Sequence, residues 1–169
     1  MRTLTSPVST QAAAEQSGWV EIYDIYLKSA ITTPFGSTSI IRITSAGIDV
    51  NFFKPTELPE AEDDQGDAAT YTAWNIGRKT IRSSSKFAND KLAIAASNVT
   101  GEWATMLSAV DWYGVPVVIR KVPTTNTGAT ANDCVVLFSG RIDSAKVTLE
   151  RVEFVASNYL GSLQTQIPN

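Results

Sequence analysis

Short apolar segments separated by turn residues are the feature that most limits the fold of this chain. Residues 48–52 alternate apolar and polar side chains, so Ile48, Val50 and Phe52 are expected on one face of a strand. Comparable segments predict further strands at 19–28, 39–45, 70–76, 91–99, 115–122, 134–139, 141–150 and 152–157. Strands this short and this closely spaced predict a mainly β fold, an antiparallel split barrel or sandwich.

Two short α-helices are expected beside the strands. Residues 9–16 contain three consecutive alanines and are followed by Gly18, which favours a helix that ends there. Within residues 100–110, apolar side chains recur at helical spacing, with Thr100 near the N-cap: Trp103, Met106, Leu107 and Val110. A hairpin turn is predicted near Glu150 and Arg151, between the last two strands.

Length and charge bound the organisation of the chain. Its 169 residues, 43% of them hydrophobic, suit a single domain spanning 1–169. The formal net charge of −3 is not that of a protein built to coat nucleic acid, although such a chain can line a passage for DNA without binding it specifically. No apolar run is long enough for a membrane helix, and no secretion signal is evident, so we expect no membrane insertion and folding in the cytoplasm.

The chain contains no histidine, which removes the commonest general base and the usual catalytic triads. We therefore expect no enzymatic activity and no cofactor. The single cysteine, Cys134, precedes the apolar run 135–138 and is expected to be a buried thiol within a strand.

An acidic segment at 54–69 is predicted to be a flexible loop because prolines bracket it and it carries little apolar surface. It lacks the alternating ligand pattern of a calcium loop, so no metal site is assigned, although metal binding or contact with a basic partner stays open beside the solvated loop. Its acidic residues are Glu57, Glu60, Glu62, Asp63, Asp64 and Asp67.

A basic stretch follows at 78–91. It can form the polar face of two strands, with lysines that guard an edge, or a surface that meets phosphates or an acidic partner. The charge of this stretch is opposite to that of the acidic segment, which would suit head-to-tail contact between neighbouring subunits. The basic residues named as candidate subunit or partner contacts, together with the acidic ones above, are Arg78, Lys79, Arg82 and Lys86; Lys91 ends the stretch.

Aromatic residues offer a further candidate. Exposed rings could stack on sugars, but packing in the core or at a subunit interface is the expectation for most of them. The residues concerned are Trp19, Trp74, Trp103, Trp112, Tyr23, Tyr26 and Tyr71.

One segment carries a resemblance beyond generic β structure. The segment begins with residues 91–99 and a short amphipathic helix up to Leu107. Next comes the stretch Tyr113-Gly114-Val115-Pro116-Val117-Val118-Ile119-Arg120-Lys121-Val122. A later stretch ends in Gly140-Arg141-Ile142 and is followed by paired strands. This order, with residues 1–30, resembles the tail-tip and baseplate-hub family of long-tailed bacteriophages. That family includes the lambda-like minor tail protein L and hub proteins of gene transfer agents. The cysteine-rich, iron–sulfur-binding end of protein L has no counterpart here.

The resemblance implies a structural role rather than catalysis. It implies a homo-oligomeric ring, three-fold or six-fold, that joins the tail tube to the central hub or fibre. Its partners would be tube, distal tail, hub, fibre or tape-measure proteins of a virion tail assembled in the host cytoplasm. The alternative that the residues leave open is a carbohydrate-binding β-sandwich used in host attachment.

Overall fold

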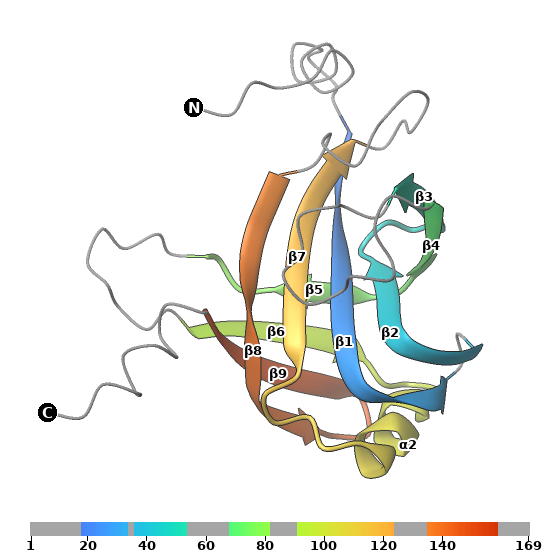
Figure 1. The fold of residues 1–169 in the computed structure, drawn as a ribbon, viewed down its shortest axis with the longest axis vertical. Helices are drawn as coiled ribbons and strands as arrows, with labels where there is room; N and C mark the ends of the chain where they lie inside the picture. The colour runs from blue at the N-terminus through green and yellow to red at the C-terminus, as the bar shows by residue number, and fades with distance from the viewer. Residues whose placement is uncertain (1–17, 34–35, 54–67, 82–90, 124–134, 159–169) are drawn as a thin grey trace, which may run out of the picture.

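A computed structural model describes residues 18–33, 36–53, 68–81, 91–123 and 135–158. Nine strands and one helix make up this part of the chain (Figure 1). The elements are β1 (Trp19–Thr33), β2 (Gly36–Thr44), β3 (Val50–Phe53), β4 (Ala68–Ala73), β5 (Ile76–Arg78), β6 (Lys91–Ser97), α2 (Glu102–Ala109), β7 (Pro116–Pro123), β8 (Val135–Val147) and β9 (Arg151–Asn158). The mainly β prediction is confirmed; the helix expected at 9–16 lies outside the described residues.

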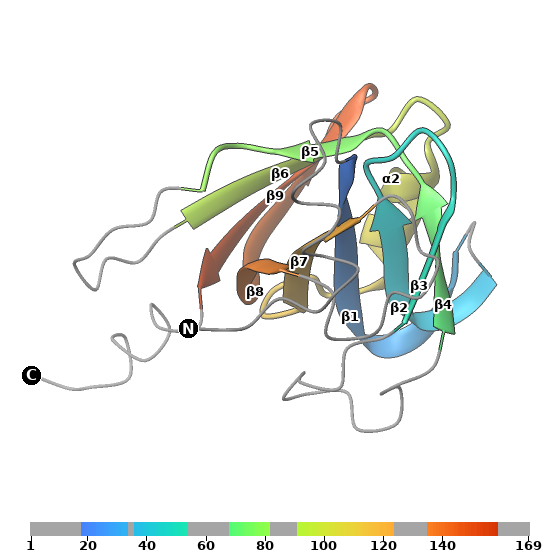
Figure 2. The ribbon, with the colours of Figure 1, turned by 90° about the horizontal axis from the view of Figure 1, so that it is seen from above.

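All nine strands belong to one sheet, in the order β3-β4-β2-β1-β7-β8-β9-β6-β5. Neighbours are antiparallel except β2 and β4, which run parallel. The sheet curls so that β5, β6 and β9 cross behind β1, β7 and β8 (Figures 1 and 2). No hydrogen-bonded ladder joins β5 back to β1 among the described strands, so the sheet is consistent with the predicted split barrel or sandwich and is not a closed barrel.

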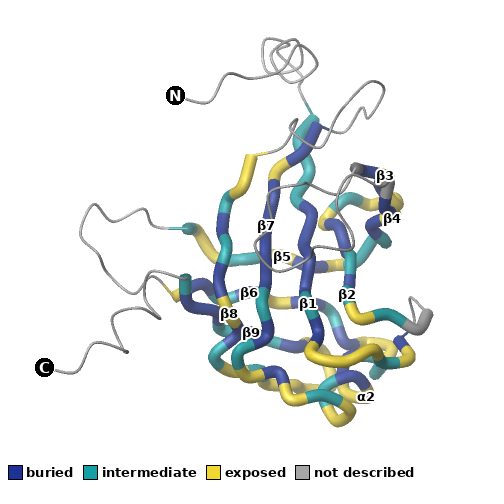
Figure 3. Tube along the Cα trace, in the orientation of Figure 1, coloured by how far each residue is buried: buried dark blue, intermediate teal, exposed yellow. Residues whose placement is uncertain are grey.

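Alternation along β1 sends side chains into two separate cores. Tyr23, Ile25 and Leu27 enter the main core inside the curled sheet. Ile22 lies on the opposite face, where it packs with Phe52 and Tyr71 beneath the β3–β4 pair. Figure 3 shows the resulting buried stretch along β1 and β7. The central strands therefore carry buried residues on both faces.

The helix α2 closes one end of the main core. Its Trp103 is fully buried, and the Trp103 ring lies 5.4 Å from that of Phe154 and 6.1 Å from that of Trp112. The helix begins after Gly101, whose φ of 74° favours glycine. Thr100 is therefore not the N-cap, and its hydroxyl donates to Glu102 instead. The predicted helical face is confirmed for Trp103 and Met106, which are buried.

The strand β8 is one continuous element of 13 residues, so the prediction of two strands, 134–139 and 141–150, is wrong. The glycine at 140 does not end a strand. It lies against β9 so closely that a Cβ there would overlap the carbonyl oxygen of Ser157. Residues 135–139 pair with β7 alone, Gly140 and Arg141 pair with both β7 and β9, and the rest of β8 pairs with β9 alone. Cys134 lies outside the described residues.

Other element boundaries also differ from the sequence prediction. Ile48 is 75% exposed in the bend before β3, not on the inner face of a strand, and the Asp49 carboxylate accepts a hydrogen bond from the Ala73 amide. The segment 70–76 is divided between β4 and β5. The predicted hairpin turn after β8 is confirmed, with the Thr148 amide donating to the Arg151 carbonyl.

Candidate functional site

An ion pair joins the terminal strand β5 to β1, a strand inside the sheet. Arg78 Nη2, on the terminal strand β5, lies 2.6 Å from Glu21 Oε1 on β1. The second oxygen of Glu21 accepts a hydrogen bond of 2.8 Å from the Tyr23 hydroxyl. Burial, aided by this bond to Glu21, raises the pKa of Tyr23 above its usual value. Arg78 thus serves the fold at a half-buried seam, where the sheet has no backbone ladder.

Of the remaining basic residues in this stretch, the structure describes Lys79 and Lys91. The Lys79 side chain is exposed, while its backbone amide donates to Ala93. The ammonium of Lys91 is exposed and lies 3.9 Å from Asp143. Arg82 and Lys86 lie outside the described residues. So do all six acidic candidates: Glu57, Glu60, Glu62, Asp63, Asp64 and Asp67.

Within the described segments, no group of three or more His, Cys, Asp or Glu residues is arranged to hold a metal ion. None of their helices is long and apolar enough to cross a membrane.

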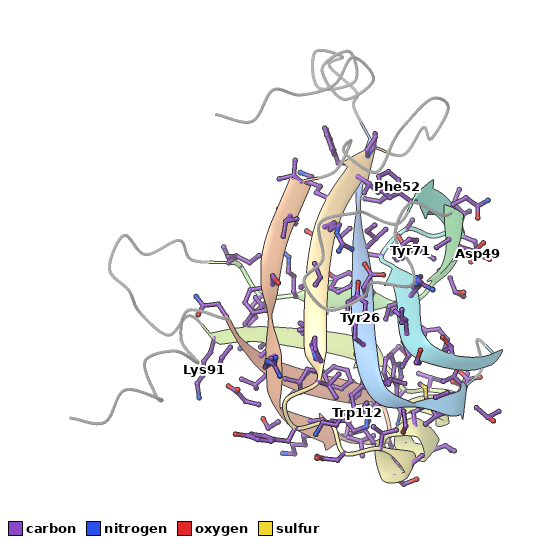
Figure 4. The ribbon with its side chains drawn as sticks, in the orientation of Figure 1. Tyr26, Asp49, Phe52, Tyr71, Lys91 and Trp112 are labelled. Carbon is purple, nitrogen blue, oxygen red and sulfur yellow. The ribbon has the colours of Figure 1, made fainter. Side chains whose placement is uncertain are left out.

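A buried ionic cluster lies on the outer face of β1 and was not anticipated from the sequence. The carboxylate of Asp24 accepts hydrogen bonds from Arg120 on β7 and from the Tyr71 hydroxyl on β4, the latter at 3.0 Å. Arg42 Nε on β2 lies 3.7 Å from the same carboxylate. Tyr26 lies next along this face of β1, as Figure 4 shows with Tyr71 above it. Four neighbouring strands are thereby joined through one aspartate.

Burial dominates the electrostatics of this cluster. It raises the pKa of Asp24, and the Arg120 charge and the Tyr71 hydrogen bond oppose that rise. Burial, with the nearby Asp24 charge, also raises the pKa of Tyr71. Asp24 and Arg120 are 2% and 0% exposed, so neither can reach a substrate in solvent. The cluster orders strands, and its only sequence signals are one aspartate and one arginine within apolar segments.

The aromatic residues mostly form core, as predicted. Trp103, Trp112, Tyr23 and Tyr71 are buried, while Trp19, Trp74 and Tyr26 are half-buried. The indole Nε1 of Trp74 donates to the Ser97 carbonyl at 3.0 Å. The rings in the described residues therefore do not form an exposed platform of the kind that stacks on sugars.

Two groups of exposed apolar side chains lie at the ends of β8. The apolar tip consists of Val147 and Leu149, at the β8–β9 turn, and Val99, in the loop before α2; their exposed fractions are 39%, 92% and 81%. The β8 rim consists of Val135 and Val136, which are 40% and 47% exposed. Both groups were missed, because an apolar residue in a strand pattern is read as core.

Asn98 holds the tip in place. Its side-chain Nδ2 donates to the Thr148 carbonyl at 2.8 Å, and its backbone amide donates to the Glu150 carbonyl at 2.8 Å. Its Oδ1 accepts from the Ala104 amide at the start of α2. Asn98 is only 3% exposed, so these bonds are protected from water. One asparagine thus fixes the loop, the turn and the helix relative to one another.

These features define a curled, mainly β sheet, consistent with a split barrel or sandwich, whose described polar clusters lie within the fold and which exposes several apolar side chains. No protein-family model matches the chain, and no curated protein matches it. A solved structure does: a chain in the "Virion of native gene transfer agent (GTA) particle" superposes with a TM-score of 0.60 at 10% identity. The match covers 98% of this chain and 48% of that one, so the present chain spans about half its length. At this identity the likeness shows a shared fold.

Proposed function

We propose that the chain is a single domain that serves as a structural component of a phage-like virion. The observation that carries the proposal is the fold, which nearly the whole chain shares with a protein of a gene transfer agent particle. The described surface supports it, because its distinctive features are exposed apolar side chains rather than a cluster of titratable groups around a cleft.

Within the virion, we propose a place at the tail tip or baseplate. There a three-fold or six-fold ring of the chain would join the tail tube to the central hub or fibre, next to distal-tail and tape-measure proteins. The sequence resemblance at residues 91–122 and 136–154 supports this place. The acidic residues of 57–67 and the basic residues Arg78, Lys79, Arg82 and Lys86 are proposed contacts with those neighbours; Arg78 also pairs with Glu21.

Labelling of the chain in purified particles, followed by electron microscopy, tests the proposal. Label at the tail end of the particle is the expected result. Label distributed over the head, or absent from purified particles, would overturn it. Among the described residues, no observation favours the carbohydrate-binding alternative, because Trp103 and Trp112 are buried and Trp19 and Trp74 are half-buried.

A further inference from the structure

One outer face of the sheet gathers most of the exposed basic side chains. On β6 and β9, Leu92, Ile94 and Phe154 point into the main core, so the residues between them point outward. In Figure 1 this outer face of β5, β6 and β9 is turned away from the viewer. Five of the seven exposed lysines and arginines in the described part of the chain lie on the outer face of β5, β6, β9 and β8, which we call the basic face: Lys79, Lys91, Arg141, Lys146 and Arg151.

The register of the strands sets the spacing of these charges. Arg141, Ser157 and Lys91 are neighbours across β8, β9 and β6, which places Arg141 and Lys91 about 10 Å apart at one end of the face. Arg151 begins β9, about 20 Å along that strand from Ser157. Lys79, next to the terminal strand β5, marks one side. The charges therefore surround an area rather than forming one cluster.

Acidic side chains offset only part of this charge. Glu153 pairs with Arg151 at 2.8 Å, and Asp143 lies 3.9 Å from Lys91. Glu150 lies in the turn just beyond Arg151. With all three acids counted, the face keeps a net charge of +2, in a chain whose net charge is −3. The positive charge of the chain is therefore concentrated on this face.

Two of the basic side chains have no ion-pair partner among the described residues: Lys79 and Lys146. The backbone of Lys79 is fixed, because its amide donates to the Ala93 carbonyl at 2.9 Å, while its side chain is exposed. Lys146 lies opposite Glu153, whose carboxylate pairs with Arg151 instead. These two ammonium groups are the ones most available to an anionic partner.

The segments that adjoin the basic face do not cancel its charge. By sequence, residues 82–90 carry two basic side chains and one acidic side chain, and residues 159–169 carry no charged side chain. The acidic segment 54–67 is attached between β3 and β4, at the opposite end of the strand order from β5.

The centre of the face is shallow and offers little apolar surface. Its side chains are no larger than valine apart from Glu153, and they include Ala93, Ala95 and Val155, beside Gly77 on β5. None of the described residues on this face is aromatic. A protein interface needs an apolar or aromatic centre, and the bases of single strands need rings to stack on. Duplex phosphates need only lysine and arginine, and a duplex carries roughly a dozen phosphate charges over about 20 Å.

We propose that the basic face contacts the phosphate backbone of duplex DNA without reading its sequence. The contact is weak and sensitive to salt, because few charges take part and none reads a base. Lys79 then meets DNA rather than a neighbouring subunit. The inference goes beyond the proposed structural role, and because one subunit carries the whole face, it can be tested on the full chain outside any particle.

Binding of short fluorescein-labelled duplexes to the full chain, measured by fluorescence anisotropy over a range of salt concentrations, tests the contact. Lys79→Gln and Lys146→Gln each remove one charge from the face. Lys28→Gln is the matched control: it removes an equally exposed charge on β1, outside the basic face, where Lys28 pairs with Asp111. Glu153→Gln removes an acid from the face. Circular dichroism confirms folding of every variant.

The wild-type chain is expected to bind in low salt, with the logarithm of the association constant falling against that of the salt concentration at a slope of about −3 to −4. Lys79→Gln and Lys146→Gln should each weaken binding at least about threefold and reduce the slope by about one, whereas Lys28→Gln should match the wild type. Glu153→Gln should bind more tightly. AT-rich and GC-rich duplexes should bind equally well.

Absence of binding in low salt, equal losses in Lys28→Gln and the two face variants, or a strong preference for one duplex sequence would each overturn the inference. A synthetic peptide of residues 55–68 represents an acidic protein partner. It is expected to bind at least about tenfold more weakly than the duplex. Binding as tight as that of the duplex, with the same losses in Lys79→Gln and Lys146→Gln, would overturn the inference in favour of a subunit contact. Labelling of particles tests the virion location separately.

Discussion

The guanidinium of Arg120 donates to the carboxylate of Asp24 in the interior, although 96 residues separate them in the sequence. Both side chains are removed from water, and Arg120 is also the cross-strand partner of Ile22, on the strand that carries Asp24. An ion pair in such a place adds little net stability while it is intact, because desolvation offsets the attraction. Its effect appears when one partner is removed.

Asp24→Asn is expected to lower the free energy of unfolding by about 3–5 kcal/mol, because Arg120 stays charged and loses its partner. Arg120→Met is expected to cost less, since a buried aspartate whose pKa is already raised can take up a proton. Urea unfolding at neutral pH measures both. The double variant Asp24→Asn/Arg120→Met should cost less than the sum of the two single changes; strict additivity would show that Asp24 and Arg120 do not interact.

Stability is expected to fall steeply in alkali. Burial raises the pKa of Tyr23, Tyr26 and Tyr71 above the unfolded value of about 10. Below that pH the folded and unfolded chains both keep these protons, so the tyrosines do not lower the free energy of unfolding. Above it the unfolded chain loses them first, so each tyrosine lowers the free energy of unfolding by up to about 1.4 kcal/mol per pH unit until its folded pKa is reached.

Tyrosinate absorbance should therefore rise together with the loss of circular dichroism. Tyr71→Phe should make the fall with pH shallower, whereas Tyr113→Phe, at a 70% exposed position, should keep the wild-type slope. The lysines titrate equally in all three proteins and cancel in the comparison. Tyrosinate formation well before unfolding would contradict the burial of these phenols.

Gly140→Ala is expected to lower the free energy of unfolding by about 1–3 kcal/mol or more, because its methyl group would overlap the Ser157 carbonyl and crowd Phe138. Gly77→Ala is the matched control: its Cβ would meet no atom within 4 Å, and reduced freedom of the unfolded chain would stabilise by about 0.4–1 kcal/mol. Urea unfolding compares them. If both substitutions changed the free energy of unfolding equally, β8 and β9 would have to move apart at Gly140 with little cost.

Asn98→Ala is expected to lower the free energy of unfolding by about 1–3 kcal/mol, because the Thr148 carbonyl and the Ala104 amide lose a protected partner. Hydrogen exchange should quicken at the start of α2 and at the β8–β9 turn. Asn98→Asp keeps the acceptor alone and should have an intermediate effect, and Asn75→Ala, at an exposed position, should change little. Unchanged exchange at the turn would show that Asn98 does not hold it.

The sequence was a reliable guide where one local pattern decides the outcome. Leu92, Ile94 and Ala96 alternate and are all buried, and the spacing of Trp103 and Met106 placed the helix correctly. The turn predicted near Glu150 and Arg151 is present after β8. In the strand and the helix, the spacing of apolar residues along the sequence decides which side chains face the core, so that spacing is enough to predict them.

Features that depend on distant partners were not predictable. In the sequence, Asp24 has the pattern of a residue on the solvent-exposed face of a strand; it is buried because Tyr71 of β4 and Arg120 of β7 pack around it. Gly140 resembles a turn until β9 approaches it. Val135 and Val136 resemble core until β9 ends short of them. No local signal distinguishes these cases, because the neighbouring strand that decides each one is remote in sequence.

The packing around Trp103 has a consequence for any channel in an assembly of this chain. Trp103, Trp112 and Phe154 fill one end of the curled sheet with rings in mutual contact, and Ile25, Ile94 and Val117 continue the filling. The inside of a subunit is therefore solid, and no duplex can thread through it. In the ring that we propose, DNA would therefore run between subunits, along the axis of the ring. Outward-facing side chains then set the width and charge of that route.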